Sequence, residues 1–368
     1  MRDSVVLVGG GHAHLHLVRN AWRFQEEGVG VVLIDPGSFW YSGMATGLLS
    51  GGYEPAEDRI DLASLARRHG VTFRSARVKG IRRGRRRVLL DDGGEVPYEL
   101  LSLNVGSETP PPAISDDGSL PTFPAKPIAR LPELRKAIRS SVAAGGAMPA
   151  IGIVGGGATG SEIAANLLGL AEVMGLSPRV TVVSPGASLA PELPKGASRR
   201  LTGELMDRGL RFLQGQRVVA VEDGEVVTDR TRFPAELLVL AHGLQAGGLV
   251  GALGVPSSRE GLRVNRFLQS VGDSRIFAAG DCADFQPRSL PKLGVFGVRQ
   301  APVLLANLRA RLGNRSLQAY RPQRAWLSIL NLGNGKGLAA WGSFWWLGRS
   351  SFLLKDQLDR RFLARYRP

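Results

Sequence analysis

Hydrophobic positions near the N-terminus predict a strand, a glycine-rich turn, a helix and a second strand. Apolar, β-branched runs at 4–8 and 29–34 are typical of buried parallel strands. Between them a triple glycine at 9–11 interrupts the pattern, and helical spacing of apolar residues predicts a helix over 13–24. This order of elements is the βαβ unit of a dinucleotide-binding fold.

The same unit recurs about 145 residues later. The pattern predicts strands at 150–154 and 180–183, which flank a glycine turn at 155–157 and a helix over 159–173. A duplicated unit of this size indicates two Rossmann-type domains rather than a short solenoid repeat. The fold class we expect is therefore α/β, with a proline-rich linker over 109–132 between the two units.

Alternating patterns outside these units predict antiparallel strands. Over 77–103, three strands are separated by an arginine-rich turn at 82–87 and a glycine turn at 93–94, and a shorter hairpin is expected at 225–231. The last 55 residues alternate glycine-rich loops with tryptophan-rich stretches and end in a basic helix. These segments add small sheets and a C-terminal α/β part to the two units.

The composition is that of a folded protein with two or three domains, because 43% of the 368 residues are apolar. No stretch approaches the roughly 20 apolar residues that span a bilayer, and 338–347 comes nearest. The N-terminus lacks the pattern of a signal peptide. We expect a cytoplasmic protein that is soluble or attached peripherally to the cytoplasmic face of the membrane.

The net charge of +15 favours contacts with anionic surfaces. Ten Lys or Arg residues and no acid lie between Leu62 and Leu90, and seven basic residues face two acidic ones after Ser328. The arginine cluster at 82–87 lacks the interleaved aromatics that stack on bases, so a solvated turn is favoured and no nucleic-acid partner is expected.

The first glycine motif has the chemistry of a dinucleotide site. Gly9 and Gly11 let the backbone approach a pyrophosphate held at a helix N-terminus, and Asp35 at the end of the next strand can bind a ribose hydroxyl. The third position departs from the pattern, because His14 stands where glycine or alanine is usual. A bulky residue there is expected to push the helix off the strand.

The second motif, Gly155-x-Gly157-x-x-Gly160, is complete. Ser184 stands at the end of the following strand, where an acid would favour NAD over NADP. Three basic residues lie downstream but not adjacent, so the choice between NADH and NADPH stays open: Lys195, Arg199 and Arg200.

A third signal is FAAGDCAD at 277–284, where a strand delivers Gly280 and Asp281 to the expected N-terminus of a helix. An acid there can bind the ribityl hydroxyls of a flavin. The alternative is an ordinary aspartate that caps the helix.

These segments together resemble the pyridine nucleotide-disulfide oxidoreductase superfamily. The motifs appear in order along essentially the whole chain: GGGHAH at Gly9, YSGM at Tyr41, LSLNVGS at Leu101, GGGATGSEIA at Gly155, GDCA at Gly280 and PKLGVFGVRQ at Pro291. Within the superfamily the chain resembles in particular the type II NADH dehydrogenase-like branch and the flavoprotein module sometimes fused to selenide, water dikinase.

The resemblance implies FAD in the first unit and NAD(P)H in the second, which is inserted in the first. It divides the chain into four segments: 1–125 and 260–312 for FAD, 126–259 for NAD(P)H, and 313–368 for the acceptor or the membrane interface. The residues that it assigns to the cofactors are Gly9, Gly11, His12, Asp35, Met44, Gly106, Gly280 and Asp281 for FAD, and Gly155, Gly157 and Gly160 for NAD(P)H.

The resemblance also implies three catalytic positions. Glu162 matches a glutamate near the contact of nicotinamide and flavin, and Lys292 and Gln300 match positions on the acceptor side. Each has a structural alternative: the helix dipole favours Glu162, Lys292 can be a solvated charge, and a buried amide such as Gln300 is usually bonded somewhere. Histidines at 12, 14 and 16 invite a metal interpretation, but no further ligands complete a zinc site, and we expect none.

The single cysteine, Cys282, restricts the reaction. Disulfide reductases and sulfide:quinone reductases of the superfamily use paired cysteines, so both activities are disfavoured. Hydride transfer from the nicotinamide to flavin N5, followed by electron transfer to an acceptor, needs no protein nucleophile. We expect an FAD-dependent NAD(P)H dehydrogenase with a quinone-type acceptor.

The C-terminus favours a quinone in a membrane. Leu354, Leu358 and Phe362 form an apolar stripe beside basic residues, which suits an anionic membrane surface or, alternatively, packing on the core. Two other functions stay open: reduction of a soluble acceptor linked to selenium metabolism, and a redox-silent flavoprotein module. A homodimer also stays open.

Overall fold

The computed structural model describes residues 4–367, and its first layer is a parallel sheet built around the N-terminal strand. The strand order is β23-β9-β1-β2-β5, and all neighbouring pairs are parallel. The strands are β1 (Ser4–Val8), β2 (Gly30–Ile34), β5 (Thr72–Arg74), β9 (Leu100–Leu103) and β23 (Ile276–Ala278). Because β23 joins from far along the chain, the first unit closes only after the second has been inserted.

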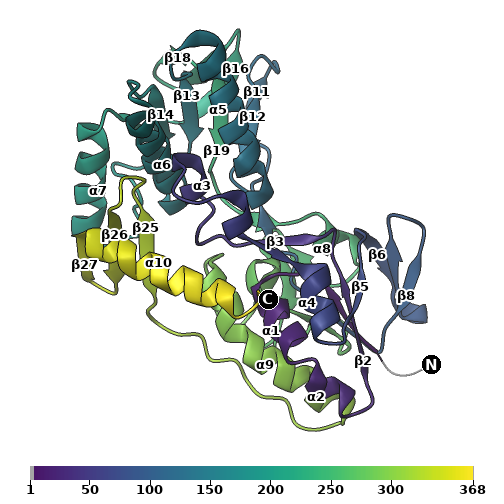
Figure 1. The fold of residues 1–368 in the computed structure, drawn as a ribbon. Helices are drawn as coiled ribbons and strands as arrows, with labels where there is room; N and C mark the ends of the chain where they lie inside the picture. The colour runs from purple at the N-terminus through teal and green to yellow at the C-terminus, as the bar shows by residue number, and fades with distance from the viewer. Residues whose placement is uncertain (1–3, 368) are drawn as a thin grey trace.

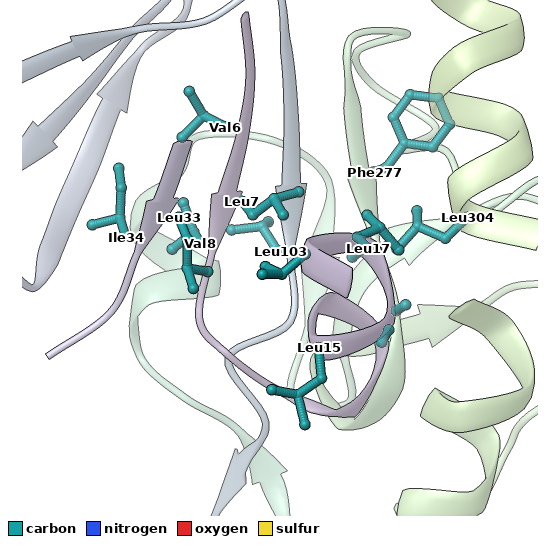
Figure 2. Close-up of a cluster of buried hydrophobic side chains, with 14 of the residues drawn as sticks. Val6, Leu7, Val8, Leu15, Leu17, Leu33, Ile34, Leu103, Phe277 and Leu304 are labelled. Atoms are coloured by element: carbon teal, nitrogen blue, oxygen red, sulfur yellow. The ribbon is translucent and has the colours of Figure 1, made fainter. Parts of the chain in front are cut away.

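Four helices flank this sheet. They are α1 (His12–Arg19), α2 (Trp22–Gln25), α4 (Leu62–Arg68) and α9 (Gly294–Leu312). Figure 2 shows Leu15 and Leu17 of α1 beneath the strands, with Leu304 of α9 and Phe277 of β23 close to Leu17. Each of these four side chains is fully buried, so α1 and α9 pack together over the sheet.

The second layer is another parallel sheet of five strands, in the order β12-β19-β13-β14-β15. Its strands are β12 (Thr122–Pro124), β13 (Ile151–Val154), β14 (Val180–Ser184), β15 (Arg211–Gln214) and β19 (Leu237–Leu240). Its helices are α5 (Leu131–Gly145), α6 (Ala158–Met174) and α7 (Lys195–Asp207). The α/β fold with two Rossmann-type units is thus confirmed, and Figure 1 shows the second unit standing above the first.

Small sheets of mostly antiparallel strands are attached to both units. The arginine-rich turn joins β6 (Val78–Arg82) to β7 (Arg87–Leu90), followed by β8 (Glu95–Pro97). The corresponding strands of the second unit are β11 (Ser115–Asp116), β16 (Val218–Glu222), β17 (Glu225–Thr228) and β18 (Arg232–Pro234). The remaining short elements are β3 (Ser38–Trp40), α3 (Gly47–Ser50), β4 (Arg59–Asp61), β10 (Ser107–Glu108), β20 (Gln245–Ala246), α8 (Leu249–Ala252), β21 (Ser257–Ser258), β22 (Gly261–Val264) and β24 (Ala283–Phe285).

The C-terminal part is a three-stranded antiparallel sheet followed by a helix. It consists of β25 (Leu327–Asn331), β26 (Gly337–Trp341), β27 (Phe344–Gly348) and α10 (Arg349–Ala364). In Figure 1, α10 (yellow) runs from this sheet, beside the second unit, to α1 of the first unit. Its last turns pack there, because the Phe362 ring stacks on Tyr41 with centroids 4.7 Å apart.

Four local predictions are corrected by the structure. The helix predicted over 13–24 breaks after α1, because the Asn20 side chain donates to the His16 carbonyl and competes with the helical pattern. The linker over 109–132 supplies edge strand β12 to the second sheet. The last strand of 77–103 joins the parallel sheet as β9. Gly280 and Asp281 start a single 3₁₀ turn rather than a helix.

Candidate functional site

A cavity of about 660 Å³ lies at the carboxyl ends of the first sheet. It is lined by the triple glycine turn, the end of β2, the loop after β9 and the 3₁₀ turn at Gly280. This is the place where parallel α/β sheets bind ligands. The predicted residues that it brings together are Gly9, Gly11, His12, Asp35, Gly106, Gly280 and Asp281.

The glycines of this turn are required by backbone contacts. Gly9 has φ +83°, and a Cβ there would lie 2.7 Å from the Asn104 carbonyl oxygen. A Cβ on Gly11 would lie 2.5 Å from the same oxygen. The turn therefore packs directly on the end of β9, which leaves its other side open to the cavity.

Asn104 ties the turn together, and its role was not predicted although it lies in the LSLNVGS motif. Its Oδ1 accepts from the backbone N–H of Ala13 (2.8 Å) and His14 (3.2 Å), and its Nδ2 donates to the Ala279 carbonyl (2.6 Å). One buried amide thus caps α1 and positions the strand that leads to Asp281.

Asp35 is held at the end of β2 by two backbone N–H groups. Its Oδ2 accepts from Gly10 at 2.8 Å and its Oδ1 accepts from Gly37 at 2.8 Å. Burial nevertheless raises the pKa of Asp35 above its usual value. The fixed carboxylate faces the cavity, as a ribose-binding acid should.

Asp281 forms an ion pair inside the cavity that the sequence did not predict. Its Oδ2 lies 2.7 Å from Lys126 Nζ and accepts from the Ser107 hydroxyl at 2.8 Å. Burial by itself would raise the pKa of Asp281, but the Lys126 cation and these hydrogen bonds lower it below the usual value. The sequence did not predict Lys126 for this site, because it lies 155 residues away from Asp281 along the chain.

His14 and His12 both lie beside the glycine turn. His14 is fully buried, and its ring bonds the Gly9 carbonyl (2.6 Å) and the Ser102 hydroxyl (2.8 Å), so the helix accommodates it beside the strand. His12 lies against the Phe39 ring, and burial lowers its pKa to about 4. Within residues 4–367, no group of three His, Cys, Asp or Glu side chains is arranged to hold a metal.

A second cavity of about 570 Å³ lies at the N-terminus of α6. Gly157, Ala158 and Thr159 line it, whereas Gly155 and Gly160 support it from behind. A Cβ on Gly160 would lie 2.0 Å from the Gly155 carbonyl oxygen, and Gly155 has φ +114°. Gly155 and Gly160 allow the tight turn, and a Cβ on Gly157 would meet only Glu192 Oε1, at 3.6 Å.

Ser184, at the end of β14, is buried next to this turn. Its hydroxyl accepts from the Gly186 N–H at 3.2 Å. The basic residues considered for a 2′-phosphate are exposed, and Arg200 pairs with Glu204.

The two cavities meet at one segment. Lys292 and Leu293 line the second cavity, and Gly294 lines the first. Lys292 Nζ donates to the Asp281 carbonyl at 2.8 Å and to the Glu260 carbonyl at 2.6 Å, so it is a bonded residue rather than a solvated charge. Gln300 is buried and its Oε1 accepts from the Gly280 N–H at 2.6 Å.

Glu162 belongs to a buried polar network that also includes Lys355, Asp359 and Tyr41. Its Oε1 accepts from the Asn331 N–H at 2.7 Å, and burial raises its pKa despite the nearby Lys355. Lys355 Nζ lies 2.7 Å from Asp359 Oδ2, and the Tyr41 hydroxyl donates to Asp359 Oδ1 at 2.8 Å. Asp359 was not predicted, and Lys355, expected among the basic residues beside the apolar stripe of this helix, is buried in the network instead.

Met44 and Cys282 also lie outside the cavity walls. Met44 is 1% exposed within the hydrophobic core and does not line the cavity. Cys282 is fully buried, and burial raises the pKa of its thiol to about 11. The thiol therefore stays neutral near pH 7 and is a poor nucleophile.

Comparison with known proteins finds matches over most of the chain. A family model described as pyridine nucleotide-disulphide oxidoreductase matches residues 3–301. Ferroptosis suppressor protein 1 of Mus musculus is 27% identical over 369 residues, which cover 96% of this chain and 92% of that protein. Demethylphylloquinone reductase NdbB of Synechocystis is 25% identical over 341 residues, with 88% and 83% covered.

A solved structure shares the fold over the whole chain. It is NDH2 from Plasmodium falciparum in complex with NADH, which superposes with a TM-score of 0.83 at 15% identity. The match covers 100% of this chain and 98% of that one.

Proposed function

The chain belongs to the pyridine nucleotide-disulphide oxidoreductase family, and from this we propose that it oxidises NAD(P)H through a bound FAD and reduces a quinone. One observation carries the proposal: two glycine-turn cavities meet at the segment 292–294, where Lys292 of one bonds the backbone of Asp281 in the other. Two dinucleotides bound in this arrangement would have their reactive ends at the same place.

The residues of the first cavity fit FAD. The glycine turn at 9–11 opens toward the cavity, as a pyrophosphate requires, and Asp35 presents a fixed carboxylate to a ribose. Asp281 and Lys126 supply a charged pair for the ribityl region. When bound, FAD accepts two electrons from the nicotinamide and delivers them to the acceptor. We assign segments 1–125 and 260–312 to FAD.

The second cavity fits a reduced nicotinamide dinucleotide, and we assign segment 126–259 to it. Thr159 and Ala158 present the N-terminus of α6, which favours a pyrophosphate. Ser184 provides no acid to exclude a 2′-phosphate, so the cofactor is written NAD(P)H.

The protein groups around the meeting point would position the reactants. Lys292 fixes the loop between the cavities, and Gln300 holds the Gly280 turn. Glu162, anchored to Asn331, has a raised pKa and therefore holds a proton more readily than an ordinary glutamate. We propose these three as the residues that orient cofactors and acceptor.

A quinone is the acceptor that the relatives favour, because one of them is named as a demethylphylloquinone reductase. Sulfur chemistry is disfavoured in this chain because Cys282 is its single cysteine and is buried behind the first cavity. Electrons would therefore pass from the flavin to the quinone without a protein thiol.

We further propose that the C-terminal segment attaches the enzyme peripherally to the cytoplasmic face of a membrane. Three large apolar side chains project from adjoining elements: Trp341 is 60% exposed, Phe344 66% and Leu353 65%. Arg361 of α10 and Arg365, which follows this helix, are exposed. An aromatic edge with cations suits a membrane interface. No helix within residues 4–367 is long and apolar enough to cross a membrane.

A direct test is reconstitution of the two half-reactions. The purified protein should be yellow with about one FAD per chain, as its single FAD cavity implies. Anaerobic NADH or NADPH should bleach the flavin, and added short-chain quinone should restore its colour. If the bleached flavin is reoxidised by other soluble acceptors but not by the quinone, the acceptor is not a quinone. If NADH and NADPH never bleach the flavin, the protein is a redox-silent flavoprotein module.

A further inference from the structure

The loop 185–194 is pinned over the glycine turn of the second cavity. Ala190 N donates to the Gly156 carbonyl at 2.6 Å, and Leu189 N donates to the Thr202 hydroxyl at 3.0 Å. Leu189 and Ala190 are both fully buried. The backbone of Ala190 has φ +45°, a left-handed conformation that is unfavourable for a residue with a side chain. The fold thus holds this loop in place against a local preference.

The pinned loop places a carboxylate on the pyrophosphate position. Glu192 Oε1 accepts a hydrogen bond from the N–H of Ala158, the first residue of α6. A Cβ built on Gly157 would lie 3.6 Å from the same oxygen. Glu192 lines the second cavity together with the residues of the helix start. Among residues 4–367, no Lys or Arg forms an ion pair with Glu192, and its hydrogen-bond partner is the Ala158 N–H.

We infer that Glu192 competes with the pyrophosphate of NAD(P)H for the N-terminus of α6 and thereby weakens cofactor binding. This inference rests on the proposed NAD(P)H site. The N–H groups that would bind the pyrophosphate are partly occupied by Glu192, and the cofactor brings a second negative group to the same place. Because Glu192 is exposed, its side chain can rotate into solvent, and the cofactor must displace it on binding.

The inference predicts tighter binding when the carboxylate is removed. Glu192→Ala frees the helix start, and Glu192→Gln keeps a hydrogen-bond acceptor for Ala158 but removes the charge. Two like charges about 4 Å apart in water predict a tightening of about five-fold. Asp207→Asn is the matched control, because it removes an exposed charge at the far end of α7 in the same unit.

Binding should be measured by calorimetry on the FAD-loaded protein with NAD⁺ and with ADP-ribose, neither of which can reduce the flavin. Both ligands carry the pyrophosphate, so both should bind more tightly to the Ala and Gln variants than to wild type. Their affinity for the control variant should equal that for wild type. The KM for NADH should fall in the same proportion. Thermal unfolding of each variant establishes that the fold is retained.

Two results overturn the inference. Weaker binding to both variants would mean that Glu192 contacts the cofactor, for example through ribose hydroxyls. Unchanged binding would mean that the carboxylate does not compete. The proposed function fails differently: neither ligand would then bind wild type or any variant, although FAD remained bound. Binding that appears only in the Glu192 variants would support the competition.

Discussion

The ion pair of Lys126 and Asp281 is the charged contact inside the first cavity, with side chains 18% and 11% exposed. Asp281→Ala removes the acid that we propose for the ribityl region and leaves Lys126 without its partner. Since hydrogen bonds to charged groups contribute about 1.5–3 kcal/mol, FAD affinity should fall about ten-fold or more. Titration of the flavin-free protein with FAD measures this.

The double variant Lys126→Gln/Asp281→Ala is the control for the unpaired charge. It should lose less affinity than the sum of the single variants, because neither charge is then left alone. If Asp281→Ala binds FAD as tightly as wild type does, Asp281 does not contact the cofactor.

Cys282 offers a test of the electron path. Its Sγ lies 3.4 Å from the Ala279 carbonyl and 3.5 Å from the Leu103 carbonyl, and a serine hydroxyl can donate to the same groups. Because burial raises the pKa of Cys282 to about 11, its thiolate is scarce at neutral pH. Cys282→Ser should keep most NAD(P)H oxidation, measured at equal FAD content. Loss of turnover with FAD still bound would restore a thiol mechanism.

Asp58 predicts a pH dependence of stability. Its side chain is fully buried, and both carboxyl oxygens lack a hydrogen-bond partner among residues 4–367. Burial, with nearby Asp359, raises the pKa of Asp58 to about 8. The unfolded chain has the ordinary pKa of about 3.9, so between these values the folded protein binds one more proton. The contribution of Asp58 to stability is therefore present at low pH and is lost as pH rises toward 8.

Asp58→Asn should abolish this loss. Relative to wild type, the variant should gain stability from pH 5 to pH 8 by up to about 1.4 kcal/mol per pH unit. Urea unfolding at pH 5, 6.5 and 8 measures the difference. Parallel pH profiles for the two proteins would show that Asp58 does not carry the proton.

At the scale of elements, the predicted apolar stripe of α10 divides between core and surface. Phe362 packs on Tyr41, Leu354 is half-buried and Leu358 is 45% exposed. Arg360 is engaged, because it pairs with Asp356 and Glu57. The membrane surface that we propose therefore consists of the β26–β27 hairpin together with one side of α10, rather than the helix stripe alone.

Attachment through these two elements predicts salt-sensitive binding to anionic vesicles. Arg361→Gln/Arg365→Gln should weaken binding about five-fold for each charge, since a basic residue near an anionic surface contributes about 1 kcal/mol. Trp341→Ser/Phe344→Ser should weaken binding to neutral vesicles as well. Cosedimentation at low and high salt measures both effects.

Trp22→Ser is the control, because Trp22 is an exposed tryptophan on α2 of the first unit. It should bind like wild type. If wild-type protein does not bind anionic vesicles at low salt, the exposed aromatic side chains have another role. A soluble acceptor would then be favoured.

At the scale of the whole molecule, the C-terminal segment joins the two units. Tyr53 and Tyr41 of the first unit donate to Asp356 (2.9 Å) and Asp359 (2.8 Å) of α10. On the other side, Asn331 of β25 donates to Glu162 of α6. The segment thus packs on both units beside the place where the cavities meet.

Separate cavities predict that the two cofactors can be uncoupled. Gly157→Val should fold, because Gly157 has an ordinary φ of −68° and its Cβ would meet only Glu192. The valine would fill the pyrophosphate position, so FAD should stay bound while NAD(P)H no longer bleaches it. Absorbance spectra before and after anaerobic NADH give both readouts. Loss of FAD in this variant would contradict the separation of the cavities.

The sequence by itself determined the two βαβ units and most of their glycines. Strand and helix periods are local properties, and Gly9, Gly155 and Gly160 are dictated by a turn that few other residues can form. The elements β1 and α6 were therefore predicted within one residue of their observed ends. Asp35 followed from its fixed distance along the same unit.

Only the tertiary structure decided which distant residues meet. Lys126 contacts Asp281, Asp359 contacts Tyr41, and Glu192 contacts Ala158, although the two residues of each pair are far apart in the sequence. The periodicity of apolar residues does not predict such long-range contacts. A charged residue in a loop or on a helix face has the same sequence signature whether it is solvated or buried against a partner. Its role depends on the burial and the neighbouring charges that folding supplies, and these set the electrostatics of both cavities.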